Sequence, residues 1–296
     1  MKQEIIKKAQ NVLHTRKRQA EREFEEKMSP LYADEEFVNV NKQLTKLMIE
    51  NAKKEINGEK KDEAAEKTFQ TQIEKLKEKH GLKDVKVSYA CKLCKDNGFK
   101  NGEMCQCLKK EISKVLLEDS GFSNLESFEE GMKKCGSLQP HYALMQKWCQ
   151  SDFKKNLIYL AGPTGVGKTY LLRCMANELI ERGKVVKIVT AYQMNQDFKE
   201  FSRTFNEEIL NRYIDIEILF IDDLGTEPLF KNVTLEHLYL IINERKMKKL
   251  PTIITSNLDM DDLKNRYDER ITSRIADRES SITTYLEGED KRLQKR

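Results

Sequence analysis

The sequence predicts an α/β fold built on a parallel five-stranded sheet and preceded by a helical segment. Between about residues 124 and 286, short apolar runs alternate with amphipathic helical stretches, which is typical of parallel strands joined by helices. Before residue 85 the chain is dense in Lys, Glu and Gln, and its apolar residues recur mostly at three- and four-residue steps. That spacing places them on narrow helical stripes, which need a partner surface.

The five predicted strands are short runs rich in Ile, Leu, Val or Thr, as expected for strands buried on both faces. They cover residues 157–160, 185–189, 216–221, 252–255 and 282–286. We expect three parts along the chain: a helical N-terminal segment at 1–87, a cysteine-containing linker at 88–120 and the α/β domain at 121–296. The helical segment is interpreted either as a self-contained bundle or partly disordered arm, or as a docking module for another protein.

The composition limits the kind of protein. Of the 296 residues, 39% are hydrophobic and 34% are charged, which is enough apolar material for a core beneath an unusually charged surface. The net charge of +4 is too small by itself to indicate a nucleic-acid-binding protein. The sequence has no run of about 18 apolar residues, and its start lacks the apolar region of a signal peptide. We therefore expect a cytoplasmic protein without a membrane partner.

A phosphate-binding loop follows the first predicted strand. Residues 162–169 read GPTGVGKT and fit the pattern G-x-x-x-x-G-K-[ST], directly after the apolar run NLIYLA and before a helical stretch. The glycines let backbone N–H groups turn toward phosphates, Lys168 reaches the β- and γ-phosphates, and the Thr169 hydroxyl ligates Mg²⁺. The predicted ATP–Mg²⁺ loop consists of Gly162, Pro163, Thr164, Gly165, Val166, Gly167, Lys168 and Thr169.

The third predicted strand runs into two acids, Asp222 and Asp223. We expect the Asp222 carboxylate to hold the magnesium shell. Asp223 is expected to orient and deprotonate the attacking water, at a position where ATPases of this class usually carry Glu. The fourth predicted strand is followed by Asn257, whose amide suits a contact with the γ-phosphate or with that water. These residues predict an ATP-hydrolysing site.

Two arginines, Arg270 and Arg274, lie four residues apart and so share one face of a predicted helix. An arginine presented to a neighbouring subunit's nucleotide would stabilise transition-state charge on the γ-phosphate, so hydrolysis would depend on self-assembly. The alternative is a surface ion pair with Glu269 or Asp277.

Four of the seven cysteines form a cluster, because Cys91-x-x-Cys94 is followed after ten residues by Cys105-x-Cys107. An odd number of cysteines in a chain without a signal peptide favours metal ligation over disulfides. The spacing predicts a structural zinc site with four thiolate ligands, and the C-x-C pair also leaves an iron–sulfur cluster open. The other three are interpreted as core-filling thiols: Cys135, Cys149 and Cys174.

Taken together, these motifs resemble the bacterial replicative helicase loaders of the DnaC and DnaI type, and the similar IstB-like ATPases that assist insertion-sequence transposases. The resemblance rests on CKLCKDNGFKNGEMCQC, GPTGVGKT, ILFIDDLGTE, TIITSN and ERITSR, and it covers about residues 88–286. It implies an AAA+ fold with sheet order 5-1-4-3-2 and no C-terminal lid domain, with only a short basic tail after residue 286. It also implies that Arg274 is the arginine finger and Arg270 its partner.

Proteins of the family that this chain resembles bind a hexameric helicase through an N-terminal region. They bind single-stranded DNA through the AAA+ domain when ATP is present. The resemblance therefore implies a DnaB-type hexameric helicase and single-stranded DNA as partners. Residues 191–213 correspond to a helical insertion of initiator-type AAA+ proteins and mix aromatic with basic side chains, which suits base stacking and phosphate contact. The mixture is Tyr192, Phe198, Lys199, Phe201, Arg203, Phe205 and Arg212. Aromatics at helical spacing are more often core residues.

The helicase-loading ATPase has two alternatives. One is a transposition helper, which generally has a shorter region before the ATPase core than the long helical arm and cysteine knuckle found here. The other is a nucleotide-gated scaffold with little turnover. Asp223 departs from the Glu of many AAA+ proteins, and its shorter reach predicts slow hydrolysis, stimulated by assembly or DNA, with ATP acting as a switch.

Overall fold

The computed structural model describes residues 2–58, 60–118, 122 and 125–290, and the chain divides into two compact units. One unit is Leu13–Asn97, and the other combines Met1–Val12 with Gly98–Arg296. The division at 1–87, 88–120 and 121–296 stays a prediction, and the predicted basic tail lies outside the described residues. Every helix in the described ranges is too short or too polar to cross a bilayer.

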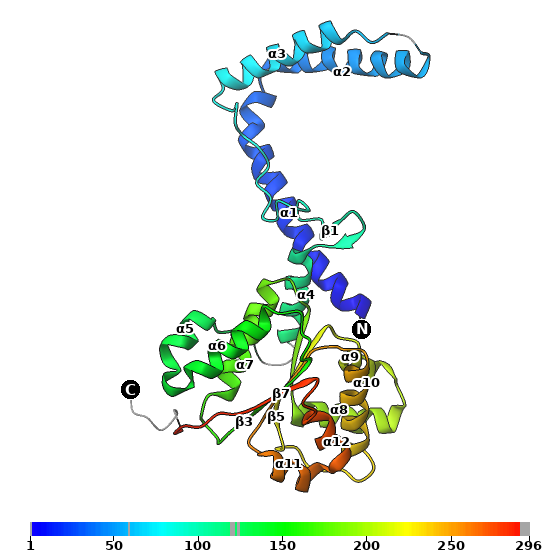
Figure 1. Cartoon of the computed structure of the whole chain (residues 1–296). Coiled ribbons are helices and arrows are strands. Elements are labelled where there is room, and N and C mark those ends of the chain that lie inside the picture. Colours follow the sequence, from blue (N-terminus) through cyan, green and yellow to red (C-terminus); the bar gives the residue numbers. More distant parts are fainter. Residues whose placement is uncertain (1, 59, 119–121, 123–124, 291–296) are drawn as a thin grey trace. The chain divides into compact units, whose positions relative to one another are not determined.

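The helical unit contains most of α1 (Lys2–Tyr32) and all of α2 (Glu35–Ile56) and α3 (Glu63–Lys79) (Figure 1). Apolar side chains from all three helices meet in a small core. It consists of Met28, Leu31, Phe37 and Leu76, with Phe24, Ile73, Leu82 and Val85 packed against it. The helices expected from the Lys- and Glu-rich composition are thereby confirmed.

Polar side chains fix the helix ends of this unit. The Asp34 carboxylate accepts hydrogen bonds from the N–H groups of Glu36 and Phe37 at the start of α2, and it lies 2.8 Å from His80 Nε2. The His80 contact lowers the pKa of Asp34 below its ordinary value. Asn51 is buried and accepts the N–H of Asp62 at 2.9 Å, which ties α2 to the start of α3.

The α/β unit is built on five parallel strands in the order β4-β5-β6-β3-β7. Their bounds are Leu157–Ala161 (β3), Val186–Thr190 (β4), Ile218–Leu224 (β5), Thr252–Ser256 (β6) and Ser281–Tyr285 (β7). Numbered one to five along the chain, the strands follow the expected order 5-1-4-3-2. A separate antiparallel pair joins β1 (Phe99–Lys100) to β2 (Glu103–Met104). Each predicted strand is present, and β5 continues past its predicted end through both acids.

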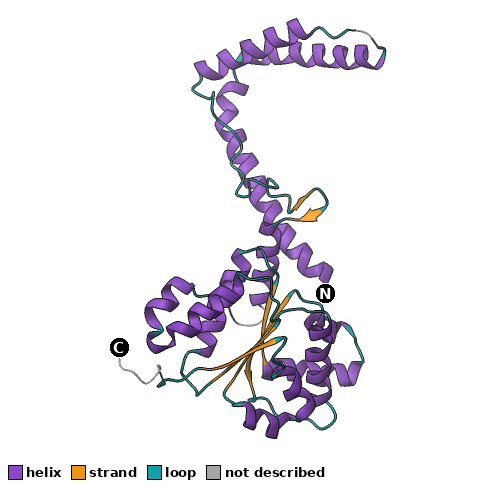
Figure 2. Cartoon of the chain, in the orientation of Figure 1, coloured by secondary structure: helices purple, strands orange, loops and turns teal. Residues whose placement is uncertain are grey.

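Helices cover both faces of the sheet (Figure 2). They are α4 (Gln106–Glu118), α5 (Phe128–Lys134), a 3₁₀ turn η1 (Gly136–Leu138), α6 (Gln139–Cys149), α7 (Lys168–Glu181), α8 (Ala191–Thr204), α9 (Glu208–Ile214), α10 (Thr234–Met247), α11 (Met260–Tyr267) and α12 (Glu269–Ile275). Successive side chains of a strand point to opposite faces, so β3 sends Ile158 and Leu160 into one core and Leu157 and Tyr159 into the other. The first core includes residues of α5–α7, and the second residues of α8–α12.

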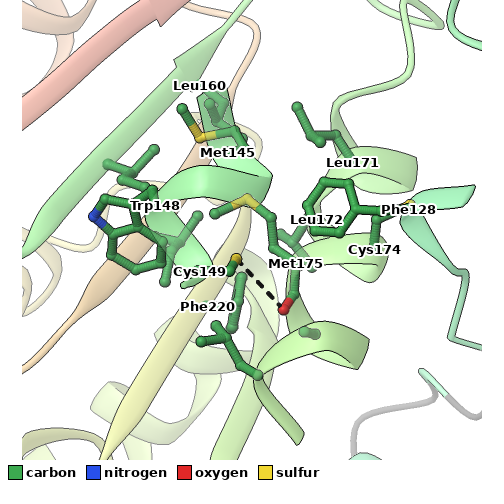
Figure 3. Packing of buried hydrophobic residues seen from close by; sticks show 14 of the residues in the cluster. Phe128, Met145, Trp148, Cys149, Leu160, Leu171, Leu172, Cys174, Met175 and Phe220 are labelled. Atoms are coloured by element: carbon green, nitrogen blue, oxygen red, sulfur yellow. Dashed lines mark hydrogen bonds between the residues drawn. The ribbon is translucent and has the colours of Figure 1, made fainter. Parts of the chain in front are cut away.

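The first core holds the three cysteines outside the cluster. Figure 3 shows Trp148 and Cys149 of α6 packed beside Met175 of α7, with the Cys149 thiol 3.9 Å from the Met175 carbonyl oxygen. Cys135 and Cys174 are also buried in this core, and burial raises the pKa of Cys174 to about 12. A thiol with such a pKa stays protonated at neutral pH, which agrees with its interpretation as a core-filling group.

A buried arginine joins α10 to the amino ends of β5 and β6. Arg245 is fully buried, and its guanidinium donates to the carbonyl oxygens of Tyr213, Ile216 and Pro251 at 2.6–2.8 Å. It also donates to the Thr252 hydroxyl at 2.8 Å. Burial lowers the pKa of Arg245 to about 9, which leaves it charged at neutral pH. Its planar fork therefore satisfies several backbone acceptors that water cannot reach.

We expect Arg245→Ala to lower the free energy of unfolding by about 3–5 kcal/mol, because buried carbonyl groups lose their donors and a cavity forms. Arg245→Lys should recover only part of this loss, because one ammonium cannot span all these oxygens. Denaturant unfolding measures the effect, and the exposed Arg278→Ala is the matched control. A loss below about 1 kcal/mol for Arg245→Ala would contradict a structural role.

Candidate nucleotide-binding site

The predicted phosphate loop leaves the carboxyl end of β3 and enters the first turn of α7. Gly165 and Gly167 have φ angles of +77° and +112°, a backbone region that residues other than glycine rarely adopt. The conformation of the loop thus explains Gly167 of the pattern and the additional Gly165 between the two pattern glycines. The N-terminus of α7 brings its free N–H groups and its partial positive charge to this loop, which favours bound anions.

Lys168 is held at the centre of the site. Its side chain is only 4% exposed, and Nζ donates to the carbonyl oxygens of Gly162 at 2.7 Å and Pro163 at 2.8 Å. Nζ also donates to Oδ1 of Asn257 at 2.7 Å. Asn257 follows β6, so the structure brings together two residues that are 89 positions apart in the sequence.

The two predicted magnesium ligands lie side by side. The Thr169 hydroxyl donates to the Asp222 carboxylate at 3.1–3.2 Å, and the Thr255 hydroxyl donates to it at 2.5 Å. Asp222 is 3% exposed, and burial raises its pKa above the ordinary value while the Thr255 hydrogen bond opposes that shift. A threonine hydroxyl next to a carboxylate is the pair of oxygen ligands that Mg²⁺ takes in P-loop sites.

Asp223 has an unusual backbone. Its φ is +55°, and its N–H donates to Oγ1 of Thr255 at 2.9 Å, at an irregularity in the pairing of β5 with β6. A residue other than glycine in this region costs about 1–3 kcal/mol and persists only where its surroundings hold it. Here the Thr255 hydroxyl supplies one such restraint, and Asp223 lines the same cavity as the phosphate loop.

The cavity has a volume of about 400 Å³. Three of its lining residues were missed by the sequence analysis: Lys134, Tyr142 and Tyr170. They lie on α5, α6 and α7, and the Lys134 ammonium lies 5.8 Å from the centre of the Tyr170 ring. Local sequence carries no signal for them, because their position depends on how α5 and α6 pack on α7. Asn257 and Asp223 line the cavity together with Lys168 and Thr169, as a single ATP site requires.

The two arginines of α12 contact α10 of the same chain. Arg274 lies 4.7 Å from the centre of the Tyr239 ring, and it donates to the Tyr239 hydroxyl at 2.8 Å and to Asn243 Oδ1 at 2.9 Å. Arg270 lies over the same ring and pairs with Asp268 at 3.0 Å. The expected alternative, a surface ion pair, is thus found for Arg270, but with Asp268 in place of Glu269 or Asp277, and Asp277 pairs with Lys246. The arginine-finger role of Arg274 stays a prediction.

The aromatic and basic residues of α8 and α9 divide into two groups. Phe198 is buried, Phe201 is partly buried, and Arg212 pairs with Asp197 at 2.5 Å. Exposed on α8 are Tyr192, Lys199 and Arg203, which are spaced by seven and four residues and so lie along one face of the helix. Phe205, beyond the helix, is 76% exposed. Part of the predicted mixture thus belongs to the core and part to the surface.

The four clustered cysteines satisfy the geometry of a metal site. Their sulfur atoms all lie within 4.8 Å of one another. The buried Asp96 carboxylate accepts the N–H groups of Ala90 and Cys91 at 2.8 and 3.0 Å, and this shapes the turn that carries the first pair. Four thiolates at such spacing fit one tetrahedral zinc ion with every position filled by the protein, which is a structural rather than a catalytic arrangement.

A phosphate loop after β3, a buried aspartate on β5 and an asparagine after the intervening strand β6 define a P-loop ATP-binding protein of the AAA+ type. Residues 144–296 match the family model described as "IstB-like ATP binding protein". The chain belongs to this family.

Individual curated proteins and solved structures are also similar to this chain. The chain is 29% identical over 225 residues to "Phage-like element PBSX protein XkdC" of Bacillus subtilis (strain 168), covering 68% of this chain and 83% of that protein. It is 31% identical over 156 residues to "Replicative helicase loader DnaC" of Escherichia coli (strain K12), covering 50% of this chain and 62% of that protein. A structure titled "Crystal Structure of the DnaI" has 30% identity, covers 51% of this chain and 82% of that chain, and has a TM-score of 0.43.

For the cysteine cluster, we expect about one zinc per chain in protein purified without chelators. Elemental analysis measures it. The double variant Cys94→Ser/Cys105→Ser should lose the metal, whereas Cys135→Ala, a cysteine of the α/β core, should keep it. Metal-free wild-type protein, or protein with the iron and visible absorbance of an iron–sulfur cluster, would contradict the zinc assignment.

Proposed function

We propose that this chain is an ATP-dependent loader of a hexameric replicative helicase of the DnaB type, acting in DNA replication on single-stranded DNA. The observation that carries the proposal is the hydrogen-bonded set of Lys168, Asn257, Thr169 and Asp222, which forms one ATP–Mg²⁺ site in a chain similar to helicase loaders. The similarity to replicative helicase loaders suggests a helicase as the partner. Exposed surfaces on α2 and α8 are the candidate contacts.

At the nucleotide, each side chain has one task. Lys168 neutralises the β- and γ-phosphates, and Thr169 with Asp222 holds Mg²⁺. Asp223 orients the attacking water, and Asn257 contacts the γ-phosphate or that water, because it already shares a hydrogen bond with Lys168. Aspartate reaches less far than glutamate, which supports slow hydrolysis that depends on assembly or DNA.

The helicase-docking surface is assigned to α2. Val38, Ile49 and Ile56 are separated by eleven and seven residues, so they lie along one face of the helix. They are 50%, 53% and 84% exposed, whereas Phe37 and Asn51 on another face are buried within the helical unit. An exposed apolar stripe on an otherwise charged helix is the usual form of a helix that docks on a partner.

Single-stranded DNA is assigned to the exposed face of α8. The Tyr192 ring offers a stacking surface, and Lys199 and Arg203 follow it along the helix at positions suited to successive phosphates. Phe205 extends the same aromatic character beyond the end of α8. Stacking with phosphate neutralisation gives binding without sequence preference, which suits a loader.

A loading assay tests the proposal. Full-length protein should bind a purified DnaB-type hexamer and place it on circular single-stranded DNA in the presence of ATP. Ile49→Glu/Ile56→Glu should weaken the complex at least tenfold, because buried charges would replace the apolar contact. Gln43→Glu is the matched control, as an exposed position on another face of α2. Lys168→Ala should abolish ATP binding and loading while keeping the helicase complex.

The other outcomes of this assay distinguish the alternatives. Binding of a transposase in place of the helicase would favour the transposition helper, which the family description also supports. Helicase binding with no ATP turnover, with or without single-stranded DNA, would favour a nucleotide-gated scaffold.

The arginine-finger assignment has its own test. Arg274→Ala should leave ATP affinity unchanged and lower DNA- or assembly-stimulated hydrolysis by about 10³–10⁵-fold, and Arg278→Ala is the exposed control. A finger acting between subunits makes a second prediction: mixing Arg274→Ala with Lys168→Ala protein should restore activity. The Lys168→Ala subunit then lends its arginine to an intact neighbouring site. No recovery on mixing, or an undiminished rate for Arg274→Ala, would contradict the assignment.

A further inference from the structure

The chain that follows β7 returns to the phosphate loop (Figure 1, red). The Leu286 N–H donates to the Ala161 carbonyl oxygen at 2.8 Å, and a Cβ placed on Gly162 would lie 2.4 Å from the Leu286 carbonyl oxygen. Gly288 lies against Val166, since a Cβ on Gly288 would lie 3.2 Å from Val166 Cγ2. Two positions of the loop are thus covered by the segment beyond β7.

Of the described residues beyond β7, Asp290 approaches a glycine of the phosphate loop most closely. A Cβ built on Gly165 would lie 1.8 Å from Oδ1, 2.1 Å from Cγ and 2.5 Å from Oδ2 of Asp290. The whole carboxylate group therefore occupies the space next to the Gly165 backbone, in the middle of the phosphate loop. Only a residue without a side chain leaves room for it there, and Gly165 also lines the nucleotide cavity.

The electrostatics favour this position for an anion. The N-terminus of α7 and the Lys168 ammonium both attract negative charge to the loop. The segment brings three acids within four residues, Glu287, Glu289 and Asp290, and Asp290 is the one placed against the loop. A carboxylate is a chemical counterpart of a phosphate here, since both are oxyanions that accept hydrogen bonds.

We propose that Glu287–Asp290 is an internal competitor for the nucleotide, with the Asp290 carboxylate and the phosphates of ATP excluding each other from the same loop. This inference rests on the proposed ATP site and adds a regulation of it. ATP has to displace the segment before it can bind. The apparent affinity for ATP is therefore reduced in proportion to the fraction of molecules in which the loop is free of Asp290. Conversely, a partner that captures the released segment would raise the affinity for ATP.

The test measures ATP–Mg²⁺ affinity of the full chain by calorimetry. Asp290→Ala and Asp290→Asn should tighten binding by about 5- to 30-fold, the range for one charge-assisted contact. The asparagine has the same shape without the charge, so its agreement with alanine would show that charge causes the competition. Glu287→Ala removes an equal charge from an exposed position in the same segment and should change the affinity less than twofold.

A second readout follows the segment itself. Amide hydrogens of residues 287–290 should exchange faster after addition of a non-hydrolysable ATP analogue with Mg²⁺. Unchanged affinity in both Asp290 variants, equal tightening by Glu287→Ala, or unchanged exchange on saturation would overturn the competition. Absence of ATP binding by wild type and variants alike would instead contradict the ATP site on which the proposal rests.

Discussion

The nucleotide site depends on holding one charged group, the Asp222 carboxylate, beneath the phosphate loop although it is almost fully buried. Burial disfavours the ionised form and raises its pKa, so the site needs donors that stabilise the negative charge. Two hydroxyl groups supply them, from Thr169 on α7 and Thr255 on β6. Because β6 pairs in parallel with both β3 and β5, their carboxyl ends meet at one edge, and the sheet itself brings these groups together.

The same hydroxyl explains the conformation of Asp223. Adjacent residues of a regular strand point to opposite faces, so two consecutive acids in a regular strand would point away from each other. The left-handed backbone of Asp223 breaks that alternation, and Thr255 accepts its N–H while donating to Asp222. One threonine thus stabilises the buried charge and restrains the strained residue beside it. The pairing of β5 with β6 becomes irregular at this point for the same reason.

The sheet and the phosphate loop were predictable because their signals are local. Short runs rich in Ile, Leu, Val or Thr mark β3–β7, and GPTGVGKT is contiguous. Features set by tertiary packing were not predictable. The helical spacing of Phe198 is the same whether it faces solvent or the core, and only the packing of α8 against the sheet, α9 and α10 decides that it is buried, beside His237. Likewise, Arg274 stacks on a tyrosine 35 residues away, and no sequence pattern links Asp290 to Gly165.

Under the proposed competition, nucleotide binding alone would displace the chain beyond β7. The triphosphate brings several negative charges to a loop beside which Asp290 already lies, and two unit charges at about 4 Å repel each other by about 4 kcal/mol near a protein surface. Mg²⁺ held by Thr169 and Asp222 would reduce that repulsion, and the exposed Glu287 and Glu289 of the same segment contribute little to it. Nucleotide binding therefore drives movement of the chain beyond β7 before any bond is cleaved. Under this proposal hydrolysis would serve to reset the site, so the shorter carboxylate of Asp223, which is expected to slow hydrolysis, is compatible with it.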